Sequence, residues 1–103
     1  MQLRYTPQFN QSFDEIMNCG NSYYSQKTLL SLFNRLKEVK GLLLSNPKLG
    51  GIAHDISNVE FEYRKIVLYK YLKLIYFIID DTIYFADIWD TRRDPSYTAS
   101  RYL

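Results

Sequence analysis

The sequence predicts a single α+β domain over residues 1–103, with the helices in the first half and most of the strands in the second. A length of 103 residues fits one domain. Apolar residues recur at helical spacing up to about residue 43, whereas from Phe61 onward Ile, Val, Tyr and Phe gather in short runs typical of strands. The composition, 47% hydrophobic and 17% aromatic, argues against a disordered chain.

A short strand and a helix open the chain. Gln2–Tyr5 alternates polar and apolar residues, as a strand does. Thr6 is a good N-cap and Pro7 suits the first helical turn, so we expect a helix from about Pro7 to Cys19, closed by Gly20. Its buried face consists of apolar residues at helical spacing, namely Phe9, Phe13, Ile16 and Met17.

A longer amphipathic helix follows, with Asn21 or Ser22 as its cap and Ser45-Asn46-Pro47 at its end. The link between the two helices is short, which predicts an antiparallel helix hairpin. The apolar face of the second helix is a stripe at spacings of three and four, formed by Leu29, Leu32, Phe33, Leu36, Val39 and Leu43.

Residues 46–60 form a turn-rich connector, after which three strand-like runs cover Glu62–Tyr69, Tyr71–Ile79 and Thr82–Asp90. Asp80-Asp81 predicts a tight hairpin between the last two. The expected order is β-α-α-β-β-β, with the helix hairpin packed on one face of a small antiparallel sheet. In the middle strand, Lys73 indicates that the odd-numbered side is the open face.

Charge and cysteine content exclude several classes of site. A net charge of +2 and a pI near 8.6 are mild for a nucleic-acid-binding protein. Cys19 is the only cysteine, which excludes an internal disulfide and a multi-cysteine zinc site. His54, the only histidine, lies in the connector without metal-ligand spacing. We expect no cofactor, no signal peptide, no membrane partner and a cytoplasmic protein.

Three motifs, taken in order, resemble the RelE/ParE superfamily. Asn46–Gly50 is similar to the Pro-x-x-Gly element of the family. Tyr63–Val67 followed by Tyr71–Tyr76 resembles its arginine strand and its apolar-Tyr strand, and Ile88–Pro95 resembles its closing strand and basic tail. The resemblance spans nearly the whole chain, from Leu3 to Tyr97.

The resemblance implies the toxin of a type II toxin–antitoxin module, neutralised by a cognate antitoxin that could use the groove of the helix hairpin and the sheet edge. One branch of the superfamily cleaves messenger RNA on the ribosome without a metal, and another inhibits DNA gyrase. We expect the first activity. The alternatives are a gyrase inhibitor without nuclease activity and an inactive, antitoxin-bound member.

Cleavage through the 2′-hydroxyl needs a base, an acid and cations that stabilise the phosphate charge. The resemblance implies a catalytic set of Arg64, Lys73, Arg92, Arg93 and Tyr97. It also implies target-binding residues, which are Lys65, Lys70, Arg101 and Tyr102. The chain departs from the nuclease pattern because no histidine follows the last strand, where Asp90-Thr91 stands, and because nearby acidic residues dilute the positive charge.

Structural alternatives exist for several of these side chains. Arg64 could pair across the sheet with Asp87 or Asp90. Arg92 and Arg93 could bind the antitoxin or be a solvated end, and Lys73 could extend its ammonium to solvent from an apolar face.

Overall fold

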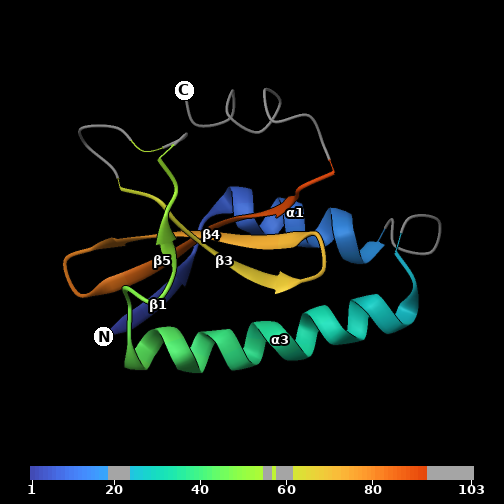
Figure 1. Cartoon of the computed structure of the whole chain (residues 1–103), viewed down its shortest axis with the longest axis horizontal. Coiled ribbons are helices and arrows are strands. Elements are labelled where there is room, and N and C mark those ends of the chain that lie inside the picture. Colours follow the sequence, from blue (N-terminus) through green and yellow to red (C-terminus); the bar gives the residue numbers. More distant parts are fainter. Residues whose placement is uncertain (19–23, 55–56, 58–61, 93–103) are drawn as a thin grey trace.

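The computed structural model describes residues 1–18, 24–54, 57 and 62–92. The elements, in chain order, are β1 (Gln2–Tyr5), α1 (Pro7–Asn18), α3 (Gln26–Ser45), β2 (Gly51–Ile52), β3 (Arg64–Tyr69), β4 (Leu72–Ile79) and β5 (Thr82–Asp90). Figure 1 shows α3 beginning near the end of α1 and running back along the sheet. The predicted α+β class and the two long helices are confirmed.

The sheet has five strands in the order β1-β5-β4-β3-β2. The meander of β3, β4 and β5 is antiparallel, as predicted. The prediction of an all-antiparallel sheet is wrong, because β1 pairs with β5 in parallel, from Gln2 opposite Thr82 to Tyr5 opposite Phe85. The connector was also expected to lack a strand, but Gly51 and Ile52 pair with β3 as the short edge strand β2.

Hydroxyl side chains cap the two helices. Thr6 Oγ1 accepts a hydrogen bond from Phe9 N at 3.1 Å and donates one to Ala86 O at 2.9 Å, which ties the start of α1 to β5. The N-cap of α3 is Ser25, whose Oγ accepts from Thr28 N at 3.1 Å. The predicted caps at residues 21 and 22 are therefore wrong, and those residues, like the predicted helix end at residues 19 and 20, lie outside the described part of the chain.

One main core joins both helices to the sheet. Its buried members include Phe9 and Ile16 of α1, Leu32 of α3, and Leu74 and Tyr76 of β4. A smaller cluster contains no residue of either helix and is formed by Ala53, Ile75 and Ala86 with Tyr63, Phe77 and Trp89 packed against them. The even-numbered side of β4 therefore faces the helices. No helix in the part of the chain that the structure describes is long and apolar enough to cross a membrane.

The odd-numbered side of β4 faces away from the helices, as Lys73 indicated, but it is not fully open. Ile75 is completely buried in the smaller cluster, while Lys73 and Phe77 are half-buried.

Candidate functional site

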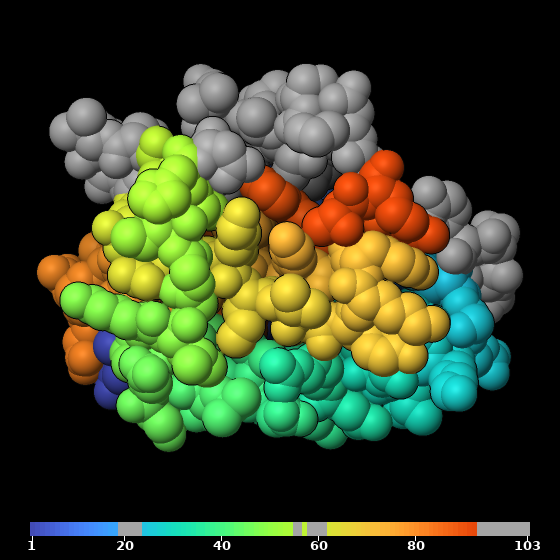
Figure 2. Space-filling view, in the orientation of Figure 1, coloured from blue at the N-terminus to red at the C-terminus, as the bar shows by residue number. Residues whose placement is uncertain are grey.

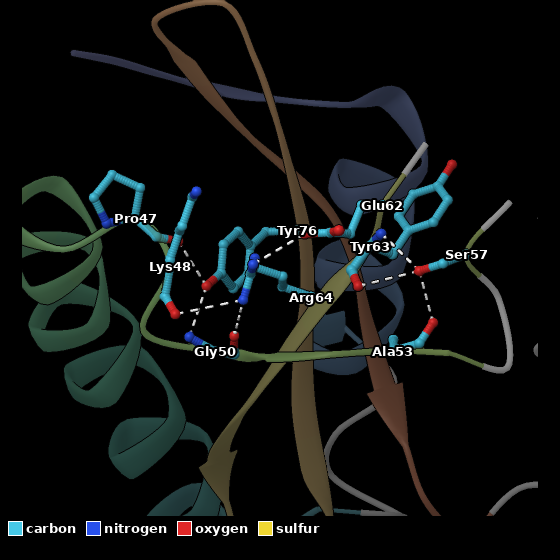
Figure 3. A network of polar contacts seen from close by, with 9 residues as sticks. All are labelled: Pro47, Lys48, Gly50, Ala53, Ser57, Glu62, Tyr63, Arg64 and Tyr76. Atoms are coloured by element: carbon cyan, nitrogen blue, oxygen red, sulfur yellow. Dashed lines mark hydrogen bonds and ion pairs between the residues drawn. The ribbon is translucent and has the colours of Figure 1, made fainter. Parts of the chain in front are cut away.

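A buried tyrosine holds the connector against the sheet. Tyr76 Oη accepts a hydrogen bond from Gly50 N at 2.8 Å and donates one to Pro47 O at 2.9 Å (Figure 3). Burial raises the pKa of Tyr76, although the hydrogen bond from Gly50 and the charge of Arg64 partly lower it. The hydroxyl therefore keeps the proton that it donates to Pro47.

Close packing requires a glycine at position 50. A Cβ atom there would lie 2.7 Å from Lys65 O and 2.8 Å from the ring and hydroxyl of Tyr76. At Gly51, by contrast, a Cβ atom would meet nothing within 4 Å. Figure 2 shows the yellow-green connector lying directly over the yellow atoms of β3. The close approach of Lys65 O and Tyr76 thus leaves no room for a side chain at residue 50.

Arg64 braces the same loop. Its Nη1 donates to Gly50 O at 2.8 Å, and its Nη2 forms an ion pair with Glu62 at 2.9 Å (Figure 3). Only 14% of the Arg64 side chain is exposed. The proposed pairing with an aspartate of β5 is wrong, because Arg64 faces its sequence neighbour Glu62 and the connector carbonyls instead. These contacts fit a structural role for Arg64.

Ser57 links two parts of the connector region through its side chain, and the sequence analysis did not predict these hydrogen bonds. Its Oγ accepts a hydrogen bond from Tyr63 N at 2.9 Å and donates to Ala53 O at 2.8 Å (Figure 3). Ala53 N donates to Tyr63 O at 2.7 Å beside it. The connector is therefore bonded to the sheet at both ends.

The strand register places Arg64 and Lys73 on opposite faces of the sheet. Arg64 pairs with Tyr76, which faces the helices, whereas Lys73 pairs with Val67 and with Trp89. Cross-strand partners share a face, and successive residues alternate. The predicted catalytic pair of Arg64 and Lys73 therefore does not converge on one site.

Lys65, which was predicted to bind the target, shares the face of Lys73. It lies opposite Ile75, two residues from Lys73 along β4. Among the described residues, no carboxylate lies within ion-pair distance of either lysine. These two cations therefore remain available to an anionic ligand.

Arg92 is held by an aspartate and an aromatic ring. Its Nη2 lies 2.7 Å from Asp90 Oδ2, and its guanidinium carbon lies 3.5 Å from the centroid of Tyr71. The Asp90 side chain is only 2% exposed and also accepts a hydrogen bond from Tyr24 Oη at 2.9 Å. Burial alone would raise the pKa of Asp90, but the hydrogen bonds from Arg92 and Tyr24 outweigh it and lower that pKa. The charge of Arg92 is thus largely neutralised within the fold.

Lys70 lies in the turn between β3 and β4. Its backbone has a positive φ of 51°, and its ammonium lies 5.2 Å from the ring centroid of Tyr69. The remaining predicted site residues, Arg93, Tyr97, Arg101 and Tyr102, lie outside the described part of the chain.

Aromatic residues accompany the two lysines on the face away from the helices. Phe77 and Tyr84 stack with ring centroids 5.0 Å apart, and Tyr63 meets Phe77 edge-on at 5.5 Å. The composition showed that the chain is rich in tyrosine but not which rings lie together. The strand register, which places Phe77 opposite Tyr84, brings these aromatic side chains together. Within the described ranges, no group of three His, Cys, Asp or Glu residues could hold a metal ion.

No family model matches the chain, and no curated protein matches its sequence.

Proposed function

We propose that the chain is the toxin of a type II toxin–antitoxin module and that it contacts ribosome-bound messenger RNA through the sheet face that carries Lys65 and Lys73. The observation that carries the proposal is that two of the three RelE/ParE-like motifs form one contact network. The Pro47–Gly50 element is bonded to Tyr76 of the apolar-Tyr strand and to Arg64 of the arginine strand. Motifs far apart in sequence thus have a common structural reason to occur together, which supports the resemblance.

The chemistry of this face supports an RNA target. Lys65 and Lys73 are cations without carboxylate partners among the described residues, so their charges can neutralise phosphate groups. Tyr84 and Phe77 offer aromatic rings of the kind on which unpaired bases stack. In this proposal the lysines stabilise phosphate charge, and proton transfer falls to Tyr97, which the resemblance assigns to the catalytic set.

A gyrase-inhibiting toxin is the second candidate. The observation that favours it is that Arg64 and Arg92, both expected in a nuclease site, are held in structural contacts. A toxin that acts by binding a protein needs no catalytic set, and the same face could serve as its interface. In either case the cognate antitoxin is the partner that silences the protein.

The test is induced expression with and without a candidate antitoxin, with transcript ends and chromosomal DNA examined in the arrested cells. Growth arrest with new transcript ends at ribosomal A-site codons, relieved by the antitoxin, is the expected result. Arrest with intact transcripts and broken DNA would replace the first proposal with the second. Normal growth at high expression would refute toxicity and leave an inactive member of the same fold.

A further inference from the structure

A row of side chains crosses the sheet on the face away from the helices and ends at the sheet edge. Tyr84 of β5 lies opposite Phe77 of β4 on one side and opposite Arg4 of β1 on the other. Leu3, which precedes Arg4, packs against the main core on the helical side. Because successive strand residues alternate between the two faces, Arg4 shares the face of Tyr84. Arg4 therefore adds a cation to the face already proposed to contact RNA.

One face of the Tyr84 ring is uncovered. Phe77 stacks on the other face, with the ring centroids 5.0 Å apart and an angle of 11° between the ring planes. Tyr63 meets Phe77 edge-on at 5.5 Å, which closes the row of rings on that side. Among the described residues, no second ring contacts Tyr84 and no cation lies over it. Since β4 lies on the side of Phe77, the uncovered face of Tyr84 is directed toward β1 and Arg4.

Arg4 keeps a charge that a ligand can use. The residue is exposed, and its hydrogen bond from Nη2 to the neutral Gln2 Oε1 is long, at 3.5 Å. No carboxylate lies within ion-pair distance of Arg4 in the described ranges. β1 is the last strand on this side of the sheet, so no further strand restricts the long side chain of Arg4. A planar guanidinium in this position suits the oxygens of a phosphate group.

We propose that Tyr84 and Arg4 form a subsite for one unpaired nucleotide, whose base stacks on the uncovered ring face while its phosphate binds the Arg4 guanidinium. The subsite rests on the proposed function in taking RNA as the natural ligand, and it extends the RNA contact to the edge strand. Lys65 on β3 and Arg4 on β1 are three strand spacings apart, about 14 Å. A single strand of roughly four stacked nucleotides, at about 3.4 Å each, covers this distance.

A nucleotide matches both parts of the subsite, which decides against an acidic protein segment as the ligand. Stacking on an aromatic ring is favourable for every base, because every base has a flat π-face. A carboxylate side chain would neutralise Arg4 but has no flat surface with which to cover the Tyr84 ring. A nucleotide carries a flat base and an anionic phosphate in one unit, and it therefore uses both side chains at once.

The test is fluorescence anisotropy with a labelled 2′-O-methyl RNA hexamer, whose blocked 2′-hydroxyls prevent cleavage. The Tyr84→Leu variant should bind this hexamer at least about fivefold more weakly, because one stacked base is lost, while Tyr84→Phe should bind it like the wild type. Arg4→Gln should also bind more weakly and should reduce the slope of log affinity against log salt by about 0.7, the share of one phosphate. Lys27→Gln is the matched control, because Lys27 lies on α3 at the other face of the sheet.

An abasic hexamer with the same number of phosphates separates stacking from charge. It should bind more weakly than the RNA hexamer, and equally to the wild type and to Tyr84→Leu. The proposal is overturned by equal binding of the two hexamers, by RNA binding of Tyr84→Leu at the wild-type level, or by an unchanged salt slope in Arg4→Gln. It is also overturned if the wild type binds no RNA hexamer, which would leave a protein partner for this face. These measurements need neither ribosomes nor growth arrest, so failure here is distinguishable from failure of the proposed function.

Discussion

The contact between Gly50 and the sheet makes a quantitative prediction for the variant Gly50→Ala. The new Cβ atom would lie 2.7 Å from Lys65 O and 2.8 Å from Tyr76. Neither neighbour can move easily, since the first is sheet backbone and the second is a fully buried ring. Overpacking costs about 1–3 kcal/mol, and displacing the Gly50 amide from the Tyr76 hydroxyl adds about 1 kcal/mol. We expect a loss of about 3 kcal/mol of unfolding free energy.

Thermal and urea unfolding, followed by circular dichroism, measure this loss. For a domain of this size, 1 kcal/mol corresponds to about 4–8 °C, so the midpoint should fall by roughly 12–24 °C. Gly51→Ala is the matched control, because its Cβ would meet nothing within 4 Å. Its midpoint should stay within a few degrees of the wild type. Equal midpoints for the two variants would refute the idea that close packing, rather than glycine flexibility, fixes residue 50.

Three further predictions concern stability. Tyr76→Phe should lower the free energy of unfolding, measured in urea, by about 2 kcal/mol, because Gly50 N loses its acceptor. Tyr84→Phe, the control, should lower it by less than about 0.5 kcal/mol. Equal losses for the two variants would contradict the hydrogen bonds between Tyr76 and the connector. Gly41→Ala should raise the free energy of unfolding by about 0.5–1 kcal/mol, since the residue lies inside α3 with nothing within 4 Å of a new Cβ. The thermal midpoint should rise with it, and a lower midpoint would contradict this. Asp90→Asn should cost about 2 kcal/mol at pH 7. Because the folded pKa of Asp90 is lowered, its contribution is present above the ordinary value of 3.8 and disappears as the pH falls through the folded value. Acid titration of both proteins should therefore show this difference shrinking below pH 3.8, and a constant difference would contradict the ion-pair explanation.

Local patterns predicted the helices and the meander well. The start of α1 at Pro7 and the Asp80-Asp81 turn followed from residues adjacent in sequence. The parallel pairing of β1 could not be predicted in this way, because alternation along Gln2–Tyr5 gives a strand no direction and no neighbour. The strand at Gly51–Ile52 is too short to produce a period and exists because Gly50 and Arg64 hold the connector at the sheet edge.

The candidate site shows a similar limit. A shift of one residue in the register between β3 and β4 would decide whether Arg64 or Lys65 shares a face with Lys73. The register is set by the pairing of Arg64 with Tyr76 and of Lys65 with Ile75, which are distant in sequence. The neutralisation of Arg92 by Asp90 involves residues only two positions apart. Sequence alone nevertheless left several roles open for Arg92, because the stacking of its guanidinium on Tyr71 depends on where β4 begins and where β5 ends.

The most direct test of the proposed target face is the growth assay with the double variant Lys65→Ala/Lys73→Ala. Both lysines make no ion pair among the described residues, so thermal unfolding should confirm a folded protein. The account predicts that this variant loses growth arrest and transcript cleavage, while Lys27→Ala/Lys48→Ala, with two exposed lysines elsewhere, arrests growth like the wild type. A folded Lys65→Ala/Lys73→Ala protein that still arrests growth at wild-type expression would contradict the assignment of this face to the target.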